Sequence, residues 1–129
     1  MTRLLFIYDD LLTGRPDDGL LAAFPHRAAT MAGHLHRLPN GRPVLVVDPE
    51  GPAIAGELVQ LPGPEPLAVL DLLNGVRDGP VLREILPAMA RGARRPAWVY
   101  TVSAKRARLL RLPALRTTDW RLVAPGGSW

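Results

Sequence analysis

The side chains that can do chemistry fall in a few places along the chain. Asp9 and Asp10 directly follow the apolar run "RLLFIY" at residues 3–8, and Asn74 precedes Gly75 at the end of "LDLLNG". A carboxylate can accept and return a proton, whereas an amide can only donate or accept hydrogen bonds. Asp9 and Asp10 are therefore candidates for proton transfer, with a solvated loop or a helix cap as the alternative interpretation.

Asn74 has a structural and a functional interpretation. Asn and Gly are favoured at helix C-termini and in tight turns, so Asn74 and Gly75 can simply end a helix. Alternatively, the amide of Asn74 binds a ligand. The residue types favour the structural interpretation.

A metal site receives little support from the sequence. His34 and His36 are two residues apart on a predicted strand, so they face the same side. No third ligand is evident beyond the distant His26, and the chain has no cysteine. We predict no metal and no cofactor, with both histidines on an exposed sheet face.

Short apolar runs separated by turn residues predict the elements of the first half of the chain. Residues 3–8 are expected to form a buried strand that opens the fold. A loop with Gly14 and Pro16 follows, and "DDGLLAAF" at residues 17–24 predicts a short helix. Three antiparallel strands are expected next, the first two joined by the turn "PNG": residues 27–38, 42–48 and 53–61.

The second half predicts two helices around a pair of strands. "PEPLAVLDLLNGV" at residues 64–76 has apolar residues at helical spacing. Strands at 81–89 and 97–103 are joined by the basic turn "ARGARRP", and a helix at 104–110 precedes the tail. We predict one α+β domain over residues 1–129, with a mixed, mostly antiparallel sheet that closes into a small barrel flanked by short helices. Residues 104–129 form its C-terminal helix and tail.

Composition limits the classes of function. The formal charge of +4 keeps nucleic acid under consideration, but the basic clusters at 92–96 and 104–111 have no interleaved aromatic residues. A solvated basic face is the favoured interpretation, and a nucleic-acid-associated module is the weaker alternative. No run is long enough to span a membrane, and the N-terminus lacks a signal segment, so a cytoplasmic location is expected.

Several segments resemble the gamma-glutamylcyclotransferase-like family. They occur in the family's order over residues 3–103, with an echo near Trp120: "FIYDDLLTG", "AGHLHRLPNGRPVLV", "IAGELVQL", "LDLLNGVRDGPVLREIL", "AWVYTV" and "TTDW". The resemblance implies a small mixed barrel with a cavity. It also implies an activity in which the α-amino group of a γ-glutamyl amine or peptide attacks its own γ-carbonyl, releasing the amine and 5-oxoproline.

This sequence departs from the family at the positions that carry the chemistry. The family's Tyr-Gly-x-Leu loop, which offers backbone N–H groups to substrate, appears as Tyr8, Asp9, Asp10 and Leu11. Its Leu-Asp-x-x-Glu-Gly motif appears as residues 70–75, with Asn74 at the position of the proton-shuttling glutamate. Val81 replaces a frequent tyrosine two residues before the arginine that matches Arg83. If the loop needs φ > 0 at the glycine position, aspartate is among the few residues that tolerate it.

Two hypotheses from the resemblance remain open. In the first, activity is lost or altered and the protein still binds a small molecule through Tyr8, Asp9, Asp10, Leu11 and Arg83. In the second, Asp9 or Asp10 acts as the base of a cyclotransferase or related amide-processing enzyme. Tyr8 can also belong to the core, and Arg83 can oppose Glu84 instead of a substrate carboxylate. The residues specify neither the ligand nor an oligomeric state.

Overall fold

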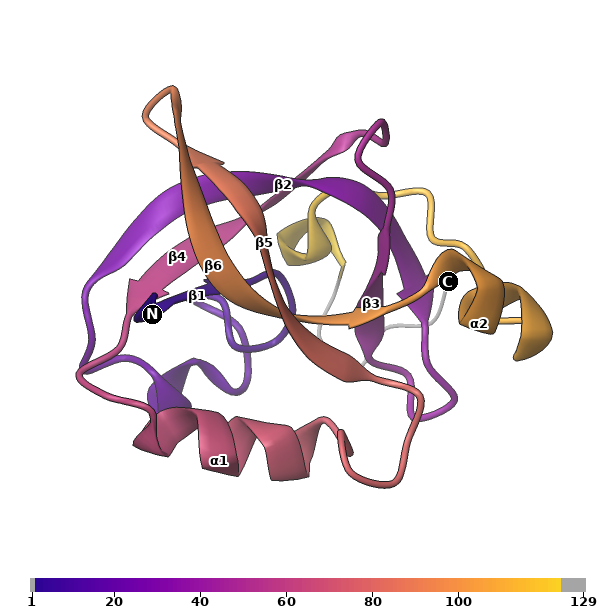
Figure 1. Ribbon diagram of the computed structural model, residues 1–129, viewed down its shortest axis with the longest axis horizontal. Helices are drawn as coiled ribbons and strands as arrows, with labels where there is room; N and C mark the ends of the chain where they lie inside the picture. Colours follow the sequence, from indigo (N-terminus) through magenta and orange to yellow (C-terminus); the bar gives the residue numbers. More distant parts are fainter. Residues whose placement is uncertain (1, 124–129) are drawn as a thin grey trace.

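The computed structural model describes residues 2–123, and a five-stranded barrel is its centre. Neighbouring strands follow the order β1 (Leu4–Ile7), β4 (Ala53–Gln60), β2 (His26–Arg37), β3 (Pro43–Val47) and β6 (Ala93–Val102). A parallel pairing of Leu5 with Trp98 joins β6 back to β1 and closes the barrel. The predicted α+β fold with a mixed, mostly antiparallel barrel is confirmed (Figure 1).

A sixth strand, β5 (Leu82–Ala90), lies outside the closed barrel and pairs antiparallel with β6 along its whole length. The turn between them consists of Arg91 and Gly92, whose φ values of 51° and 74° suit a two-residue hairpin. The prediction that residues 90–96 form the turn was therefore wrong. Arg94, Arg95 and Pro96 continue β6, because the tight turn lets pairing start at Ala90 and Ala93.

Two groups of buried side chains stabilise the barrel. The inner group combines alternating positions of the five barrel strands with the end of β5, which pairs with β2 at Met89: Phe6, Tyr8, Ala29, Met31, Leu35, Leu45, Ile54, Leu58, Ala88, Ala90, Ala97 and Val99. The other faces of β1, β3 and β6 pack against the loop after β1, the helix α1 (Glu65–Leu73) and the C-terminal segment. Alternate residues of these strands therefore pack into two separate cores, an inner core within the barrel and an outer core around it.

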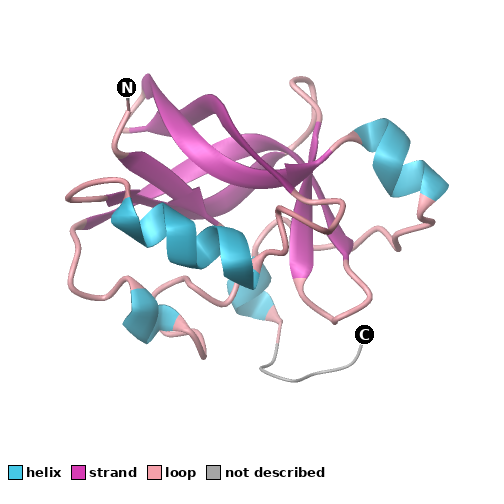
Figure 2. Cartoon of the chain, turned by 60° about the horizontal axis from the view of Figure 1, so that its bottom comes forward, coloured by secondary structure: helices cyan, strands magenta, loops and turns pink. Residues whose placement is uncertain are grey.

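The helices lie outside the barrel. Figure 1 shows α1 running beside the strands, and Figure 2 shows it next to the short turn of 3₁₀ helix at Asp18–Leu20. α1 buries Leu67 and Leu70 and ends at Leu73; Asn74 is its C-cap residue, and Gly75 follows with φ 63°. α2 (Ala104–Leu109) begins at Ser103, whose hydroxyl accepts the backbone N–H of Arg106.

The helix predicted at residues 17–24 is only this 3₁₀ turn. Among its apolar residues only Leu21 is fully buried, since Leu20, Ala22 and Ala23 are exposed. One buried residue cannot provide the apolar stripe that stabilises a short helix. Within residues 2–123, no helix is long and apolar enough to cross a membrane. Residues 124–129 of the predicted tail lie outside the described residues.

Candidate functional site

Tyr8 lies at the end of β1 and belongs to the core. Its hydroxyl donates to the carbonyl of Tyr100 at 2.6 Å and accepts the backbone N–H of Leu45 at 3.0 Å. Burial, and secondarily the charge of Asp9, raise the pKa of the Tyr8 phenol far above its usual range. Tyr8 therefore stays neutral and connects β1 to β3 and β6.

Replacing Tyr8 with phenylalanine is expected to lower the free energy of unfolding by about 2 kcal/mol, because two buried backbone groups lose their partner. Urea denaturation measures this loss of free energy, and an unchanged m-value shows that unfolding remains two-state. A loss within ~0.5 kcal/mol, the range of a neutral surface substitution, would contradict the bridging role.

Asp9 is buried at the start of the loop after β1. Its Oδ1 accepts the backbone N–H of Leu11 at 3.1 Å, and its Oδ2 pairs with Nη2 of Arg42 at 3.0 Å. Burial raises the pKa of Asp9, although Arg42 and the Leu11 N–H oppose this. Among residues 2–123, the only non-glycine residues with positive φ are Arg91 and Arg111, so the backbone at Asp9 does not require glycine.

Asp10 points to the C-terminal segment. Its Oδ1 accepts Nε1 of Trp120 at 2.8 Å and Nη2 of Arg15 at 3.2 Å. The buried Arg15 also donates to the carbonyl of Val123 and lies 5.7 Å from the centre of the Trp120 ring. Asp10 is thus part of a structural contact between the loop and the 3₁₀ turn at Trp120–Leu122. Leu11 is buried in the outer core.

Asn74 lies at the C-terminus of α1, and its Nδ2 donates to the carbonyl of Leu70 at 2.9 Å. The same side chain lines a groove of about 350 Å³ between the end of α1, the β2–β3 turn and the segment after α2. Its other lining residues are largely apolar: Leu38, Pro39, Asn40, Pro80, Val81, Leu110 and Leu112. Asn74 therefore caps the helix and also lines this groove.

Asp71 of α1, Arg83 of β5 and Tyr100 of β6 form a polar cluster. Asp71 Oδ1 accepts the Tyr100 hydroxyl at 2.8 Å and Nε of Arg83 at 2.9 Å. Burial, followed by the contact with Asp71, raises the pKa of Tyr100 far above its usual range. Arg83 also stacks on Trp98, 4.6 Å from the ring centre. It does not oppose Glu84, which instead accepts the hydroxyl of Thr101.

Each of the three histidines has a hydrogen-bond partner. His34 pairs with Asp48 at 2.8 Å, and His36 Nδ1 lies 3.0 Å from the carbonyl of Leu112. His26 contacts Glu57 at 3.2 Å. His34 is exposed as expected, whereas His36 is only partly so. In the described part of the chain, no group of three His, Cys, Asp or Glu residues is placed to hold a metal ion.

Residues 5–122 match the family described as gamma-glutamyl cyclotransferase, AIG2-like. The chain belongs to this family. A comparison with curated proteins found no match. The match to the family over residues 5–122 confirms the resemblance noted in the sequence.

Solved structures support the gamma-glutamyl cyclotransferase fold. YkqA from Bacillus subtilis matches with a TM-score of 0.70 and 20% identity, over 94% of this chain and 40% of YkqA. This chain thus spans well under half of the YkqA chain. An AIG2-like protein from Mus musculus matches with a TM-score of 0.67 and 18% identity, over 91% of this chain and 88% of that one. PH0828 from Pyrococcus horikoshii has a TM-score of 0.61 and 11% identity.

Only some of the residues that match the gamma-glutamyl cyclotransferase motifs lie close together in the structure. Tyr8 and Arg83 both reach Tyr100, one through its backbone carbonyl and the other through Asp71. Asp10 faces away to Trp120, and Asn74 faces the groove. Sequence analysis missed Arg42 and Tyr100 as partners of the motif residues. A tyrosine within the apolar run "AWVYTV" is a signal for Tyr100, but nothing local marks Arg42.

Proposed function

We propose that this family member has lost the cyclotransferase reaction and uses the groove beside Asn74 to bind a small ligand. The observation that carries the proposal is the amide of Asn74 at the groove, at the position of the family's glutamate. Formation of 5-oxoproline requires a proton to leave the attacking amine and to reach the departing one. An amide cannot move that proton.

The neighbouring carboxylates are poor replacements for the missing base. Asp71 is held by Arg83 and Tyr100, and Asp10 by Arg15 and Trp120. Neither carboxylate lines the groove. The proton shuttle of the family is therefore not restored by these two acids.

The substrate loop is also changed in a way that disfavours a γ-glutamyl group. Asp9 Oδ1 already accepts the N–H of Leu11, so the loop's own carboxylate occupies a donor that an incoming carboxylate would need. Its negative charge would repel that group, strongly so where water is excluded. Both effects lower the affinity for γ-glutamyl substrates.

What remains supports binding of a compact, mostly apolar molecule. The groove volume of about 350 Å³ lies at the low end of the ~300–1,000 Å³ typical of ligand pockets. Asn74 Oδ1 has no partner among the described residues and can accept a hydrogen bond from a ligand. A ligand with an apolar body and an N–H or O–H donor fits this lining.

The test is 5-oxoproline release from γ-glutamyl amines, γ-glutamyl peptides and glutathione. We expect none from the wild type, and measurable release from the double variant Asp9→Gly, Asn74→Glu, which restores both family residues. Asn74→Gln is the matched control, because it changes the side-chain length without adding an acid. Release by the wild type would contradict the loss of activity, and its survival in Asn74→Gln would show that residue 74 does not carry the reaction.

A second candidate is an enzyme in which Asp9 is the base. Its buried position favours this, because burial raises the pKa of Asp9 above its usual range, and a higher pKa makes a carboxylate a stronger base. In that case the wild type turns over an amide substrate, and Asp9→Asn abolishes the reaction without a loss of folding. Activity unchanged in Asp9→Asn would exclude this candidate.

A further inference from the structure

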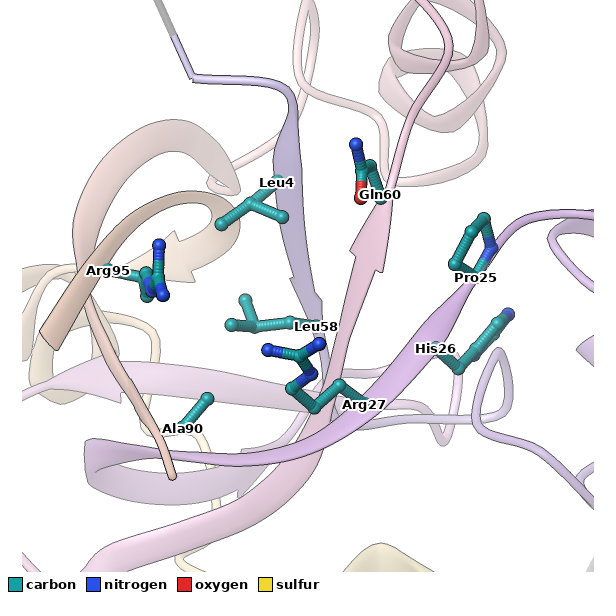
Figure 3. A pocket seen from close by; sticks show the side chains of 8 residues that line it. All are labelled: Leu4, Pro25, His26, Arg27, Leu58, Gln60, Ala90 and Arg95. Atoms are coloured by element: carbon teal, nitrogen blue, oxygen red, sulfur yellow. The ribbon is translucent and has the colours of Figure 1, made fainter. Parts of the chain in front are cut away.

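A second hollow lies at the other end of β1, far along the strand from the loop at Asp9. It is formed where β1, β2 and β4 meet the β5–β6 hairpin, and its volume is about 170 Å³. Three apolar side chains, Leu4, Leu58 and Ala90, form its wall (Figure 3). Leu58 and Ala90 are buried members of the inner core, so this hollow is a mouth of the barrel.

Two arginines from different strands enter this mouth. Figure 3 shows the guanidinium of Arg27, from β2, and that of Arg95, from β6, directed into the same space from opposite sides. Gln60 lies at the rim, whereas the ring of His26 turns away and contacts Leu21 and Glu57. No Asp or Glu is among the residues that line the hollow.

No carboxylate balances the two arginines of this mouth, whereas four arginines elsewhere in the described chain do have a counter-charge. Arg15, Arg42, Arg83 and Arg121 each pair with an aspartate. Within residues 2–123, the side chain of neither Arg27 nor Arg95 has a hydrogen-bond or ion-pair partner. Arg27 and Arg95 are both exposed, so water reaches them, but two like charges that share one small hollow still repel each other. An anion bound between them would relieve it.

We infer that this barrel mouth binds a phosphate group between Arg27 and Arg95. Guanidinium groups present planar forks of N–H donors that match phosphate oxygens in bidentate geometry. A phosphate monoester carries about −1.5 to −2 charges at pH 7, which balances both arginines, whereas one carboxylate balances a single arginine. The small volume suits a phosphate head group, with any remaining part of the ligand outside the mouth.

Isothermal titration calorimetry with inorganic phosphate and with glycerol 3-phosphate, at constant ionic strength, tests the inference. Both probes are expected to bind the wild type, and tighter binding of glycerol 3-phosphate would identify the ligand as an organic phosphate. Arg27→Gln and Arg95→Gln should each weaken binding by about tenfold or more, because each removes charge-assisted hydrogen bonds.

Arg108→Gln is the matched control. Arg108 lies on α2, is exposed, and does not line the mouth, yet its replacement removes the same charge. This variant should bind both probes like the wild type. Equal weakening by all three substitutions would overturn the site in favour of a general charge effect. Salt-dependent binding of a single-stranded oligonucleotide without binding of either small phosphate would also overturn it, in favour of a nucleic acid surface.

Discussion

Replacing Arg42 with methionine is expected to lower the free energy of unfolding by about 3 kcal/mol at pH 7, because the buried carboxylate of Asp9 loses its cationic partner. The two side chains are largely buried, with exposures of 21% for Arg42 and 9% for Asp9. The N–H of Leu11 alone then opposes the burial of the charge. Urea denaturation monitored by tryptophan fluorescence measures the loss.

The effect should depend on pH in a defined direction. Asp9 has a raised pKa in the folded protein, so the folded state binds its proton more tightly than the unfolded state does. Its carboxylate therefore destabilises the fold as pH rises from about 4, the usual range of an aspartate, through the raised pKa. Removing Arg42 raises that pKa further. The destabilisation by Arg42→Met should be largest at pH 7 and smallest near pH 4.

A double-mutant cycle separates this pair from other effects of Arg42. In an Asp9→Asn background no buried charge remains, so Arg42→Met should have little further effect and little pH dependence. An equal loss in both backgrounds would show that Arg42 stabilises the protein through its aliphatic stem instead of through Asp9.

Gly56→Ala should be at least as damaging, with a loss of about 3 kcal/mol or more. A Cβ built at Gly56 would lie 2.2 Å from the carbonyl oxygen of Ile7 and 2.6 Å from Cζ of Phe6. The first neighbour is backbone, so β1 and β4 would have to move apart. Because Tyr8 and the Asp9 loop follow Ile7, the same displacement would disturb the candidate site. Thermal unfolding and the near-ultraviolet circular dichroism of the aromatic core measure both effects.

Gly19→Ala provides the control for Gly56. No atom lies within 4 Å of a Cβ built at Gly19, and its φ is not in the left-handed region. This substitution should leave the melting temperature nearly unchanged. Similar losses at Gly19 and Gly56 would contradict the close approach of β1 to β4 as the cause, because the effect of Gly→Ala on the unfolded chain is stabilising at both positions.

The periodic segments of the sequence predicted most of the strands. The "PNG" turn lies between two apolar runs, and the structure has β2 and β3 paired there with Leu35 opposite Leu45. α1 and its end before Gly75 also follow from local signals, since proline begins a helix and a glycine with positive φ ends it. Such signals are local and act within a few residues.

Other elements were not predicted, because they depend on contacts between residues that are far apart in the sequence. The 3₁₀ turn at Asp18–Leu20 is short because only Leu21 finds a buried position, which the run "GLLAAF" does not show. The start of β6 at Ala93 depends on pairing with β5, so a stretch rich in arginine and proline became strand. Tertiary pairing overrode local propensity at both places.

For the candidate site, the sequence by itself determined the family, the placement of Asn74 at the end of a helix, and the presence of two acids after β1. Only the tertiary structure decided what these residues contact: Asp9 meets Arg42 of the β2–β3 turn, and Asp10 meets Trp120 near the end of the described chain. It also brought Arg27 and Arg95 to one barrel mouth. The physical reason is that barrel closure joins strands far apart in the chain, and charge pairing between them leaves no periodic signal in the sequence.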